Sequence, residues 1–171
     1  MATDEELVGR LARGEESALA ELLRRHERSL SSFLYRRTGG RDVEDLYQET
    51  WVRVLRHARD FDTSRRFSTW LYQIALNLAR DWHRRPPPEA HETDAAAAES
   101  PELARAEAGL DAARLLERLP EAQRDVVILR FYHDLSEEQV AEILDCPKGT
   151  VKSRLHHALA RLSQLAGKEK V

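Results

Sequence analysis

The segment from Cys146 to Gly167 holds the side chains whose chemistry is clearest, because it contains cations and hydrogen-bond donors but no acidic residue. Ammonium, guanidinium, hydroxyl and imidazole groups of this kind bind phosphates and the edges of bases. A ligand responds to the charges within about 8–10 Å of it, so this segment can attract a polyanion although the net charge of the chain is −3. The groups concerned belong to Lys148, Lys152, Ser153, Arg154, His156, His157 and Arg161.

Two predicted helices would carry these groups. Ser136 followed three residues later by Gln139 is a capping pattern that begins a helix, and the run Asp145-Cys146-Pro147 predicts a tight turn before a second helix. Asp145 tolerates the left-handed backbone of such a turn better than most residues. The layout predicts a helix-turn-helix that meets the major groove of DNA, with a plain helical hairpin bearing solvated lysines as the alternative. The side of the second helix that would pack on the first consists of Val151, Leu155, Ala158 and Leu162.

Charge and proline divide the chain. Residues 1–85 carry 16 Lys and Arg against 14 Asp and Glu, residues 86–111 carry 1 against 7, and residues 112–171 carry 10 against 9. Pro86-Pro87-Pro88 cannot continue a helix, and the acidic stretch after it is poor in large apolar residues, which predicts a flexible tether. A short helix over the four alanines 95–98 is the alternative. The expected organisation is a domain at 1–85, an acidic linker at 86–101 that could span at most about 55 Å, and a second domain at 102–171.

Both domains are expected to be helical, since no alternation of Val, Ile and Thr typical of strands occurs. A Thr3–Glu6 capping pattern begins the first helix, which should end near Gly14. The further predicted helices are 17–37, 42–59 and 67–85 in the first domain and 103–119, 121–132, 136–144 and 148–166 in the second. The fold class is therefore all-α, with two small helical domains. In the helix 67–85, one apolar stripe would consist of Phe67, Trp70, Leu71, Ile74, Leu78 and Trp82.

Several classes of protein are excluded by what the sequence lacks. No run of about 18 apolar residues exists, and the acidic start MATDEELVGR has no apolar core of a signal peptide, so neither a membrane span nor secretion is expected. Cys146 is the only cysteine, which excludes an intrachain disulfide and favours a reducing cytoplasm. The sequence contains no P-loop, dinucleotide fingerprint, H-E-x-x-H motif or cysteine pair for zinc, so we expect no enzyme, no cofactor and no metal.

Three stretches of the second half resemble region 4 of extracytoplasmic-function sigma factors. They are LPEAQR at 119–124 with LSEE at 135–138, and PKGTVKSRL at 147–155. The resemblance implies that the second helix of the helix-turn-helix binds the −35 promoter element. By position, Lys152, Ser153, His156 and His157 would face bases and phosphates, with Lys148 and Arg154 on the DNA backbone.

The run DVEDLYQET at 42–50 resembles region 2.2 of the same family, the surface that docks on the clamp helices of the polymerase β′ subunit. The interpretation from the residues alone is a helix with a solvated polar face. Val43, Tyr47, Trp51, Val54 and Leu55 would form its broad buried side. The resemblance implies that Asp45, Gln48, Glu49 and Arg53, on the other side, contact core RNA polymerase, and acidic and amide groups suit a basic partner helix.

The loop at 61–66 and the helix after it resemble regions 2.3 and 2.4. Primary sigma factors hold a tryptophan pair there, whereas here Trp70 is followed by Leu71, as in the small alternative sigma factors. The resemblance implies that the loop captures one unstacked base of the −10 element and that the helix meets the adjacent duplex edge, with Arg65 and Arg66 neutralising phosphates. The implied −10 residues are Asp62, Thr63, Ser64, Arg65, Arg66, Asn77, Arg80 and Arg84.

Taken together, these resemblances cover roughly residues 17–85 and 112–165 and imply an alternative sigma factor. Such a protein would bind core RNA polymerase and promoter DNA, initiate transcription in the cytoplasm, and be controlled by an anti-sigma partner. A stand-alone helix-turn-helix regulator is the alternative, but it would leave Asp45, Gln48 and Glu49 without a role. A decoy that occupies the polymerase without binding DNA is disfavoured by the basic face at 148–161.

Overall fold

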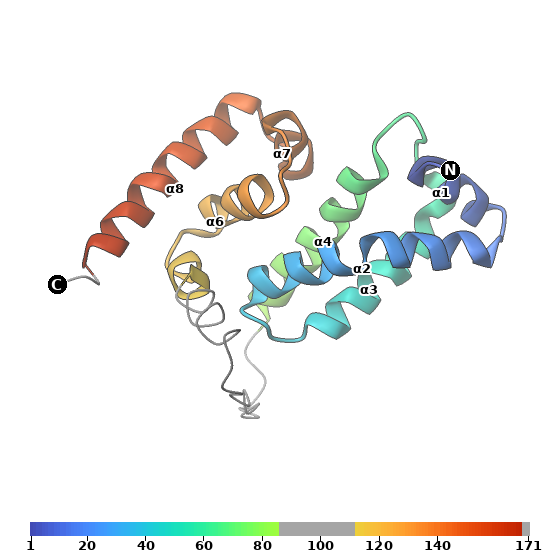
Figure 1. Ribbon diagram of the computed structural model, residues 1–171, viewed down its shortest axis with the longest axis horizontal. Coiled ribbons are helices and arrows are strands. Elements are labelled where there is room, and N and C mark those ends of the chain that lie inside the picture. Colours follow the sequence, from blue (N-terminus) through green and yellow to red (C-terminus); the bar gives the residue numbers. More distant parts are fainter. Residues whose placement is uncertain (86–111, 169–171) are drawn as a thin grey trace.

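The computed structural model describes residues 1–85 and 112–168, and every regular element in these two ranges is helical (Figure 1). The N-terminal half (residues 1–85) contains α1 (Asp4–Ala12), α2 (Glu16–Thr38), α3 (Val43–His57), a 3₁₀ turn (Ala58–Asp60) and α4 (Phe67–Arg84). The C-terminal half (residues 112–168) begins with a helical stretch at 112–117 and continues with α6 (Glu121–Val127), a π-helical turn (Ile128–Tyr132), α7 (Glu137–Leu144) and α8 (Lys148–Lys168).

The predicted all-α fold is confirmed, and the predicted helices agree with the observed ones to within a few residues at each end. The exception is the predicted helix 121–132, which is α-helical only to Val127 and then widens into the π-helical turn. The predicted linker at 86–101, the alternative helix at 95–98 and the first part of the predicted helix 103–119 lie outside the described residues.

Short-range capping explains where the helices begin and end. Thr3 Oγ1 accepts the Glu6 backbone N–H at 3.2 Å, while a Glu6 carboxylate oxygen accepts the Thr3 N–H at 2.9 Å. Ser136 and Gln139 form the same reciprocal pair at 3.2 and 2.9 Å, as their spacing predicts. Gly39 ends α2 with φ 67°, a conformation that costs glycine little.

Helix α4 is buried on more of its circumference than the sequence predicts. Phe67, Leu71 and Leu78 of the predicted stripe are buried, whereas Trp70, Ile74 and Trp82 are only half-buried. The reason is that α4 contacts α2 and α3 on one side and α7 of the C-terminal half on another. The additional buried residues of α4 are Thr69, Tyr72, Ala75, Leu76 and Ala79.

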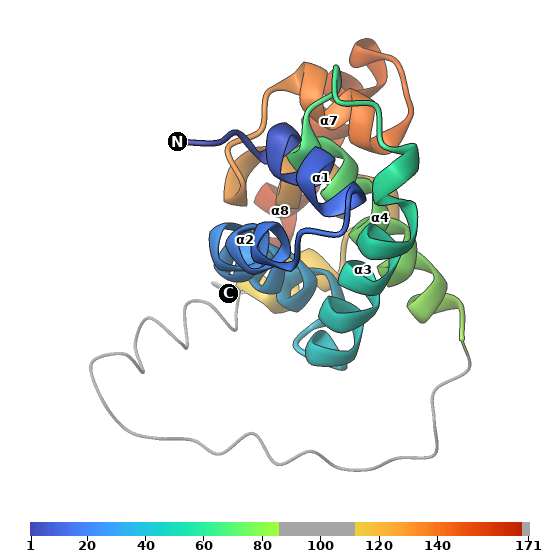
Figure 2. The same ribbon diagram turned by 90° about the vertical axis from the view of Figure 1, so that its right-hand side faces the viewer.

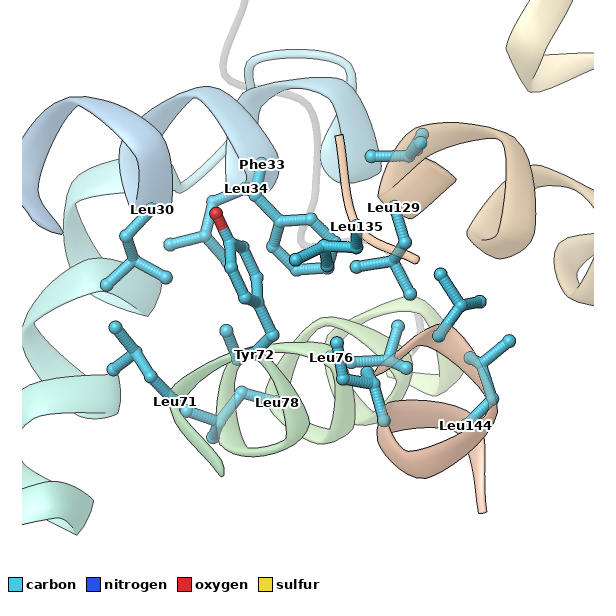
Figure 3. Close-up of a cluster of buried hydrophobic side chains, with 14 of the residues drawn as sticks. Leu30, Phe33, Leu34, Leu71, Tyr72, Leu76, Leu78, Leu129, Leu135 and Leu144 are labelled. Atoms are coloured by element: carbon cyan, nitrogen blue, oxygen red, sulfur yellow. The ribbon is translucent and has the colours of Figure 1, made fainter. Parts of the chain in front are cut away.

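The two halves share one apolar core. Phe33 of α2 and Leu76 of α4 lie against side chains of the C-terminal half, including Leu129 of the π-helical turn (Figure 3). Phe33, Leu76 and Leu129 are each 0% exposed, so solvent is excluded from this contact as it is from the interior of either half. The two ribbon views agree that α7 lies beside α4 (Figures 1 and 2).

A buried ion-pair network lies beside this shared core. The side chains of Arg37 on α2 and Asp125 on α6 are both 0% exposed, and Arg37 Nε lies 2.7 Å from Asp125 Oδ1. These two atoms are in ion-pair contact without a well-aligned hydrogen bond, and the other Asp125 oxygen accepts from Arg80 Nη2 of α4 at 2.9 Å. Arg37 Nη2 also donates to Glu121 Oε1 at 2.6 Å. We call these four residues, Arg37, Arg80, Glu121 and Asp125, the interhalf network.

A cavity at Leu129 should destabilise both halves together. We expect Leu129→Ala to lower the free energy of unfolding by about 2–5 kcal/mol, because the side chain is fully buried, and Leu159→Ala to change it by less than about 0.5 kcal/mol, because Leu159 is 48% exposed. Urea unfolding followed by tryptophan fluorescence reports the N-terminal half, which holds all three tryptophans of the chain. An unchanged fluorescence transition in Leu129→Ala would show that the halves do not unfold cooperatively.

Candidate functional site

The exposed face of α3 combines polar and apolar side chains. Asp45 and Gln48 are exposed and Glu49 is half-buried, with Arg53 Nε 3.2 Å from a Glu49 carboxylate oxygen. The prediction that Leu55 belongs to the buried side of this helix is wrong, because Leu55 is 46% exposed. The residues that face the core are instead Leu46, Thr50, Trp51 and Val54, while Val43 and Tyr47 are half-buried.

Two apolar residues therefore accompany the predicted polymerase contacts. Val52, which is 36% exposed, and Leu55 follow Gln48 by four and seven residues, which places all three along one side of the helix. We call Asp45, Gln48, Glu49, Val52 and Leu55 the α3 face. Sequence periodicity missed its apolar part, because apolar residues are assigned to the core by default.

The loop at 62–66 has a defined shape that Asp62 maintains. The Asp62 carboxylate accepts the Ser64 backbone N–H at 2.9 Å, and the Asp62 carbonyl accepts the Arg65 N–H at 3.0 Å. Hydrogen bonds from Ser64 hold the pKa of Asp62 below its usual value, so the carboxylate is ionised at neutral pH. Asp62, Thr63, Ser64, Arg65 and Arg66 are all exposed, which leaves the loop open to a ligand.

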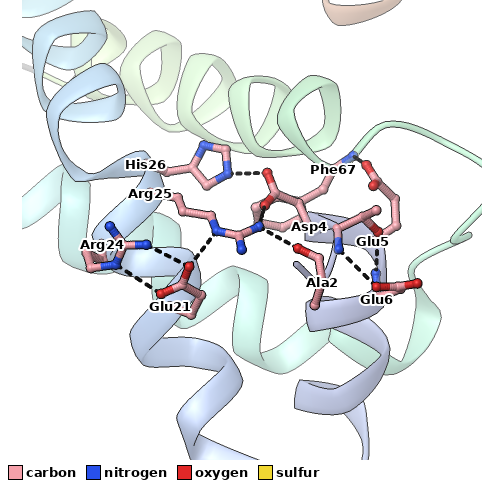
Figure 4. A network of polar contacts seen from close by, with 10 residues as sticks. Ala2, Asp4, Glu5, Glu6, Glu21, Arg24, Arg25, His26 and Phe67 are labelled. Carbon is pink, nitrogen blue, oxygen red and sulfur yellow. Dashed lines mark hydrogen bonds and ion pairs between the residues drawn. The ribbon is translucent and has the colours of Figure 1, made fainter.

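A cluster of three aromatic rings packs at the two ends of this loop. The rings of Phe61 and Trp70 lie 4.8 Å apart between centroids, and Phe67 contacts both of them at 6.1 and 6.0 Å. Glu5 of α1 accepts the Phe67 backbone N–H at 2.8 Å, so α1 provides the N-terminal cap of α4 that Arg66 does not provide (Figure 4). The loop is thus held at both ends by packed or hydrogen-bonded groups.

An open groove of about 970 Å³ runs between this loop and α1. Arg65 and Arg66 line one side, and Gly9, Arg10 and Arg13 line the other. The role of α1 in this groove carries no signal along the sequence, because more than fifty residues separate Arg13 from Arg65. Arg10 is paired with Glu15 at 2.8 Å, and Arg13, the C-cap residue of α1, lies 3.9 Å from the same carboxylate. The side chain of Arg13 is 68% exposed, so it is the more available of the two cations.

The three residues predicted on α4 have different surroundings. Asn77 and Arg84 are exposed, and Arg84 lies 3.6 Å from an Asp81 oxygen. Arg80 is only 26% exposed because it belongs to the interhalf network. Arg65 of the loop is likewise engaged, with Nη2 at 2.8 Å from Glu142 of α7. Two of the predicted −10 residues, Arg65 of the loop and Arg80 of α4, therefore contact acidic residues of the C-terminal half.

The helix-turn-helix is built as the sequence predicts. Val140, Ile143 and Leu144 of α7 are buried against Val151, Leu155 and Ala158 of α8, and Leu162 is half-buried. Asp145 adopts the left-handed conformation at φ 49°, and Cys146, half-buried in the turn, lies 3.9 Å from Arg154 Nη1. Lys148, Lys152, Ser153, His156 and His157 are exposed on the opposite face, and Arg154 is half-buried.

Two acidic residues of α7 hold the lysines of this face. Lys148 Nζ donates to Glu138, which keeps the pKa of that carboxyl well below its usual value, and Lys152 Nζ lies 3.8 Å from Glu137. Water screens ion pairs this exposed and makes them weak, so a phosphate can replace either carboxylate at little cost. The pairs hold the two lysines beside the exposed outer face of α8.

His133 lies between the two halves. Its Nδ1 is 3.0 Å from the Tyr72 hydroxyl, and its ring contacts Phe33 at 5.7 Å between centroids. Burial lowers the pKa of His133 from 6.5 to about 4, and the charge of Arg36 adds to this effect while Asp134 opposes it. Burial raises the pKa of Tyr72, so its hydroxyl stays protonated and can donate to the neutral imidazole.

Within residues 1–85 and 112–168, no group of three or more His, Cys, Asp or Glu side chains could hold a metal ion. Over the same residues, no helix is both long and apolar enough to cross a lipid bilayer.

Comparison with known proteins assigns the family. The sequence model of Sigma-70 region 2 matches residues 22–86, and that of Sigma-70, region 4 matches residues 110–162. The ECF RNA polymerase sigma-E factor of Escherichia coli is 34% identical over 174 residues, covering 91% of this chain and 90% of the relative. The chain belongs to the ECF sigma factors. The sigma-E factor of Haemophilus influenzae is similar as well, with 32% identity over 173 residues and 91% of each chain covered.

Two solved structures share the fold over both halves. CnrH, solved in complex with the cytosolic domain of CnrY, superposes with a TM-score of 0.78 at 28% identity, covering 96% of this chain and 97% of that one. The sigma factor RpoE from Bartonella quintana, solved with the anti-sigma factor NepR, has a TM-score of 0.68 at 22% identity, covering 87% and 96%. The N-terminal half of this sigma factor thus corresponds to region 2 and the C-terminal half to region 4.

The titration of His133 predicts how pH acts on the fold. Unfolding returns the pKa of His133 towards 6.5, so the unfolded chain binds a proton that the folded chain excludes. The resulting stability is present above pH 6.5 and is lost as the pH falls towards 4. We expect the free energy of unfolding to fall over this range in the wild type, and part of that fall to disappear in His133→Gln.

The matched control for this measurement is His57→Gln, because His57 is exposed on α3 and lies outside the shared core. Urea unfolding at half-unit steps between pH 7 and pH 4 gives the difference between each variant and the wild type, which cancels the titration of the carboxylates. A His133→Gln profile that runs parallel to the wild type would contradict the assignment.

Proposed function

We propose that this ECF sigma factor binds core RNA polymerase through the α3 face and directs it to promoters through two DNA-binding surfaces. The observation that carries the proposal is the presence, in one chain, of an exposed acidic and apolar helix face together with a helix-turn-helix whose outer face is basic. A stand-alone DNA-binding regulator would need only the second of these features.

The α3 face suits a basic, partly apolar helical partner such as the clamp helices of the β′ subunit. Asp45, Gln48 and Glu49 supply carboxylate and amide groups, with Arg53 positioning Glu49. Val52 and Leu55 add apolar surface at the same place, and interfaces of this kind gain affinity from an apolar centre surrounded by polar contacts.

The loop at 62–66 is proposed to hold an unstacked base of the −10 element. Asp62 fixes the backbone of the loop, Thr63 and Ser64 offer hydroxyls, and Arg65 and Arg66 neutralise phosphates. A base outside the stack must be held by hydrogen bonds and enclosed, and the groove against α1 provides the space. Asn77, Arg80 and Arg84 of α4 would then meet the adjacent duplex.

The outer face of α8 is proposed to enter the major groove at the −35 element. Lys152, Ser153, His156 and His157 would contact bases and phosphates there, while Lys148 and Arg154 would contact the DNA backbone. The domains that carry these activities are proposed to be residues 1–85 and 102–171, joined by a linker at 86–101.

The remaining assignments follow from this function. The sigma factor would perform no chemistry itself, because the polymerase makes every bond, and it would act in the cytoplasm where that enzyme works. Control by an anti-sigma factor is proposed on the likeness to CnrH and RpoE, which were each solved with a protein partner.

Removal of the polar part of the α3 face should prevent core binding. We expect Gln48→Ala combined with Glu49→Ala to weaken the affinity for core RNA polymerase by at least about 100-fold, because central interface residues carry most of the binding free energy. The matched control is Glu27→Ala with Arg28→Ala, two adjacent exposed residues of α2. Fluorescence anisotropy of labelled sigma factor with purified core measures both, and an unchanged affinity in the first variant would refute the assignment.

Loss of one phosphate contact should be visible in the salt dependence. We expect Lys152→Ala to weaken binding to a duplex that carries the −35 element and to lower the slope of log K against log salt by about one. Gln164→Ala, an exposed neutral residue of α8, should leave the slope unchanged. The same slope in Lys152→Ala as in wild type would remove Lys152 from the DNA-contacting set.

A further inference from the structure

The groove between α1 and the loop at 62–66, which we call the α1 groove, is lined by more cations than anions. Its four arginines are Arg10 and Arg13 on the α1 side and Arg65 and Arg66 on the loop side. Its two acidic residues, Glu5 and Glu6, each accept a backbone N–H, from Phe67 at 2.8 Å and from Thr3 at 2.9 Å. Because the carboxylates are fewer than the guanidinium groups and serve as helix caps, the α1 groove attracts an anion.

One arginine on each side of the α1 groove is available to a ligand. The side chain of Arg66 is exposed and forms no ion pair within residues 1–85 and 112–168. The side chain of Arg13 is 68% exposed and lies 3.9 Å from the Glu15 carboxylate. Arg10 and Arg65 are each paired more closely with a carboxylate, at 2.8 Å. An anion that enters the groove would therefore meet an available guanidinium on each side.

Gly9 lies inside α1 and lines the α1 groove. Glycine within a helix is less favourable than alanine, because it loses more backbone freedom on folding. Among the described residues outside the adjacent backbone, the nearest atom that an added Cβ would meet is Arg13 Nη1, at an ordinary contact distance of 3.8 Å. Packing therefore does not require glycine at this position, whereas the close approach of a ligand to the helix backbone would.

The α1 side of the groove is held firmly in place. The residues that bury its inner face are Leu7, Val8 and Leu11. The Asp4 carboxylate lies 2.8 Å from Arg25 Nη1 and 2.7 Å from His26 Nε2, which ties the start of α1 to α2 (Figure 4). At the other end of the helix, Arg59 Nε donates to the Ala12 carbonyl at 3.3 Å. The groove is thus preformed, so binding would not have to order α1.

A single strand of DNA suits this groove better than a separate small anion. The groove is open, measures about 970 Å³ and carries cations on two sides, so it can accommodate consecutive phosphates of one chain. None of the described residues that line it is aromatic. It would therefore hold the sugar-phosphate backbone rather than stack bases, and its binding would tolerate any sequence.

The position of the α1 groove along the proposed DNA path indicates which nucleotides would enter it. The proposed duplex contacts extend towards the C-terminal end of α4 at Arg84, whereas the loop lies before its N-terminal end at Phe67. Helix α1 lies at that N-terminal end, where Glu5 caps Phe67 (Figure 1). A strand that leaves the duplex and places one base in the loop would continue towards α1 with the nucleotides that follow, on the downstream side.

We propose that α1 forms the second wall of a channel for the melted promoter strand, a role that rests on the proposed −10 function of the loop. Arg13 contacts a phosphate just downstream of the captured base, opposite Arg66 of the loop. Gly9 lets the sugar-phosphate backbone lie close against the helix. The channel adds affinity for the melted strand without adding sequence preference.

Two promoter forks separate the α1 groove from the loop. Both carry −35 and −10 sequences obtained by run-off transcription, and both are duplex up to the captured base. In the short fork the single strand ends at that base, and in the long fork it continues for about six nucleotides. Each fork is labelled with fluorescein and titrated by fluorescence anisotropy with holoenzyme assembled from core polymerase and this sigma factor. The gain in affinity from the longer tail reports contacts beyond the captured base.

Removal of the Arg13 cation should affect only the long fork. We expect Arg13→Ala to lower the slope of log K against log salt by about 0.7 with the long fork, because one phosphate contact to a single strand is lost, and to leave the slope unchanged with the short fork. The matched control is Arg28→Ala, which removes the same charge from an exposed position of α2 and should change neither slope. A change of equal size with both forks, or with neither, would refute the role of Arg13.

Gly9→Leu tests the space beside the helix. Leucine favours a helix more than glycine does, and circular dichroism should show a thermal midpoint at least as high as that of the wild type. We expect this variant to lose most of the affinity gain of the long fork and to bind the short fork as the wild type does. A full gain in Gly9→Leu would show that the strand does not approach α1.

The short fork tests the loop separately. If wild-type holoenzyme binds it no more tightly than a blunt duplex that ends before the captured base, the −10 function of the loop fails and the role of α1 fails with it. Normal binding of the short fork, with an unchanged long-fork slope in Arg13→Ala, would leave the loop in place and overturn only the channel. That second result is expected if an acidic partner protein, rather than DNA, occupies the α1 groove.

Discussion

The buried ion pair between Arg37 and Asp125 is the interaction on which the rest of this arrangement depends. An arginine and an aspartate whose side chains are both 0% exposed need charged partners, because an unpaired buried charge would carry a desolvation cost of several kcal/mol; they pair with each other, and Glu121 and Arg80 complete the network. Arg37 lies near the end of α2 and Asp125 lies in α6, so the pair fixes the C-terminal half against the N-terminal half. Arg80 and the shared apolar core then follow from that placement.

This placement connects folding with function. The surface of α4 that packs against the C-terminal half adjoins the loop at 62–66, so the contact between the halves lies beside the proposed DNA-binding loop. The α3 face lies apart from these contacts and keeps its exposed carboxylates and apolar residues.

Local patterns in the sequence predicted the helices well, since capping residues such as Thr3 and Ser136 and the left-handed Asp145 act over a few residues. The helix-turn-helix was predictable for the same reason. Three features could not be predicted from local patterns, because each depends on which distant element lies alongside. They are the exposure of Leu55, the wide burial of α4 and the cap that Glu5 provides to Phe67. The engagement of Arg80 by Asp125 is of this kind too: residues 45 positions apart meet only in the folded chain.

The most direct test of the central claim is run-off transcription with purified bacterial core RNA polymerase, this protein and a fragmented genomic template. The account predicts discrete transcripts that require both proteins, start downstream of a shared pair of −35 and −10 sequences, and disappear with Gln48→Ala combined with Glu49→Ala. The absence of any sigma-dependent transcript, together with no measurable binding to core, would contradict it and leave a stand-alone DNA-binding regulator as the better description.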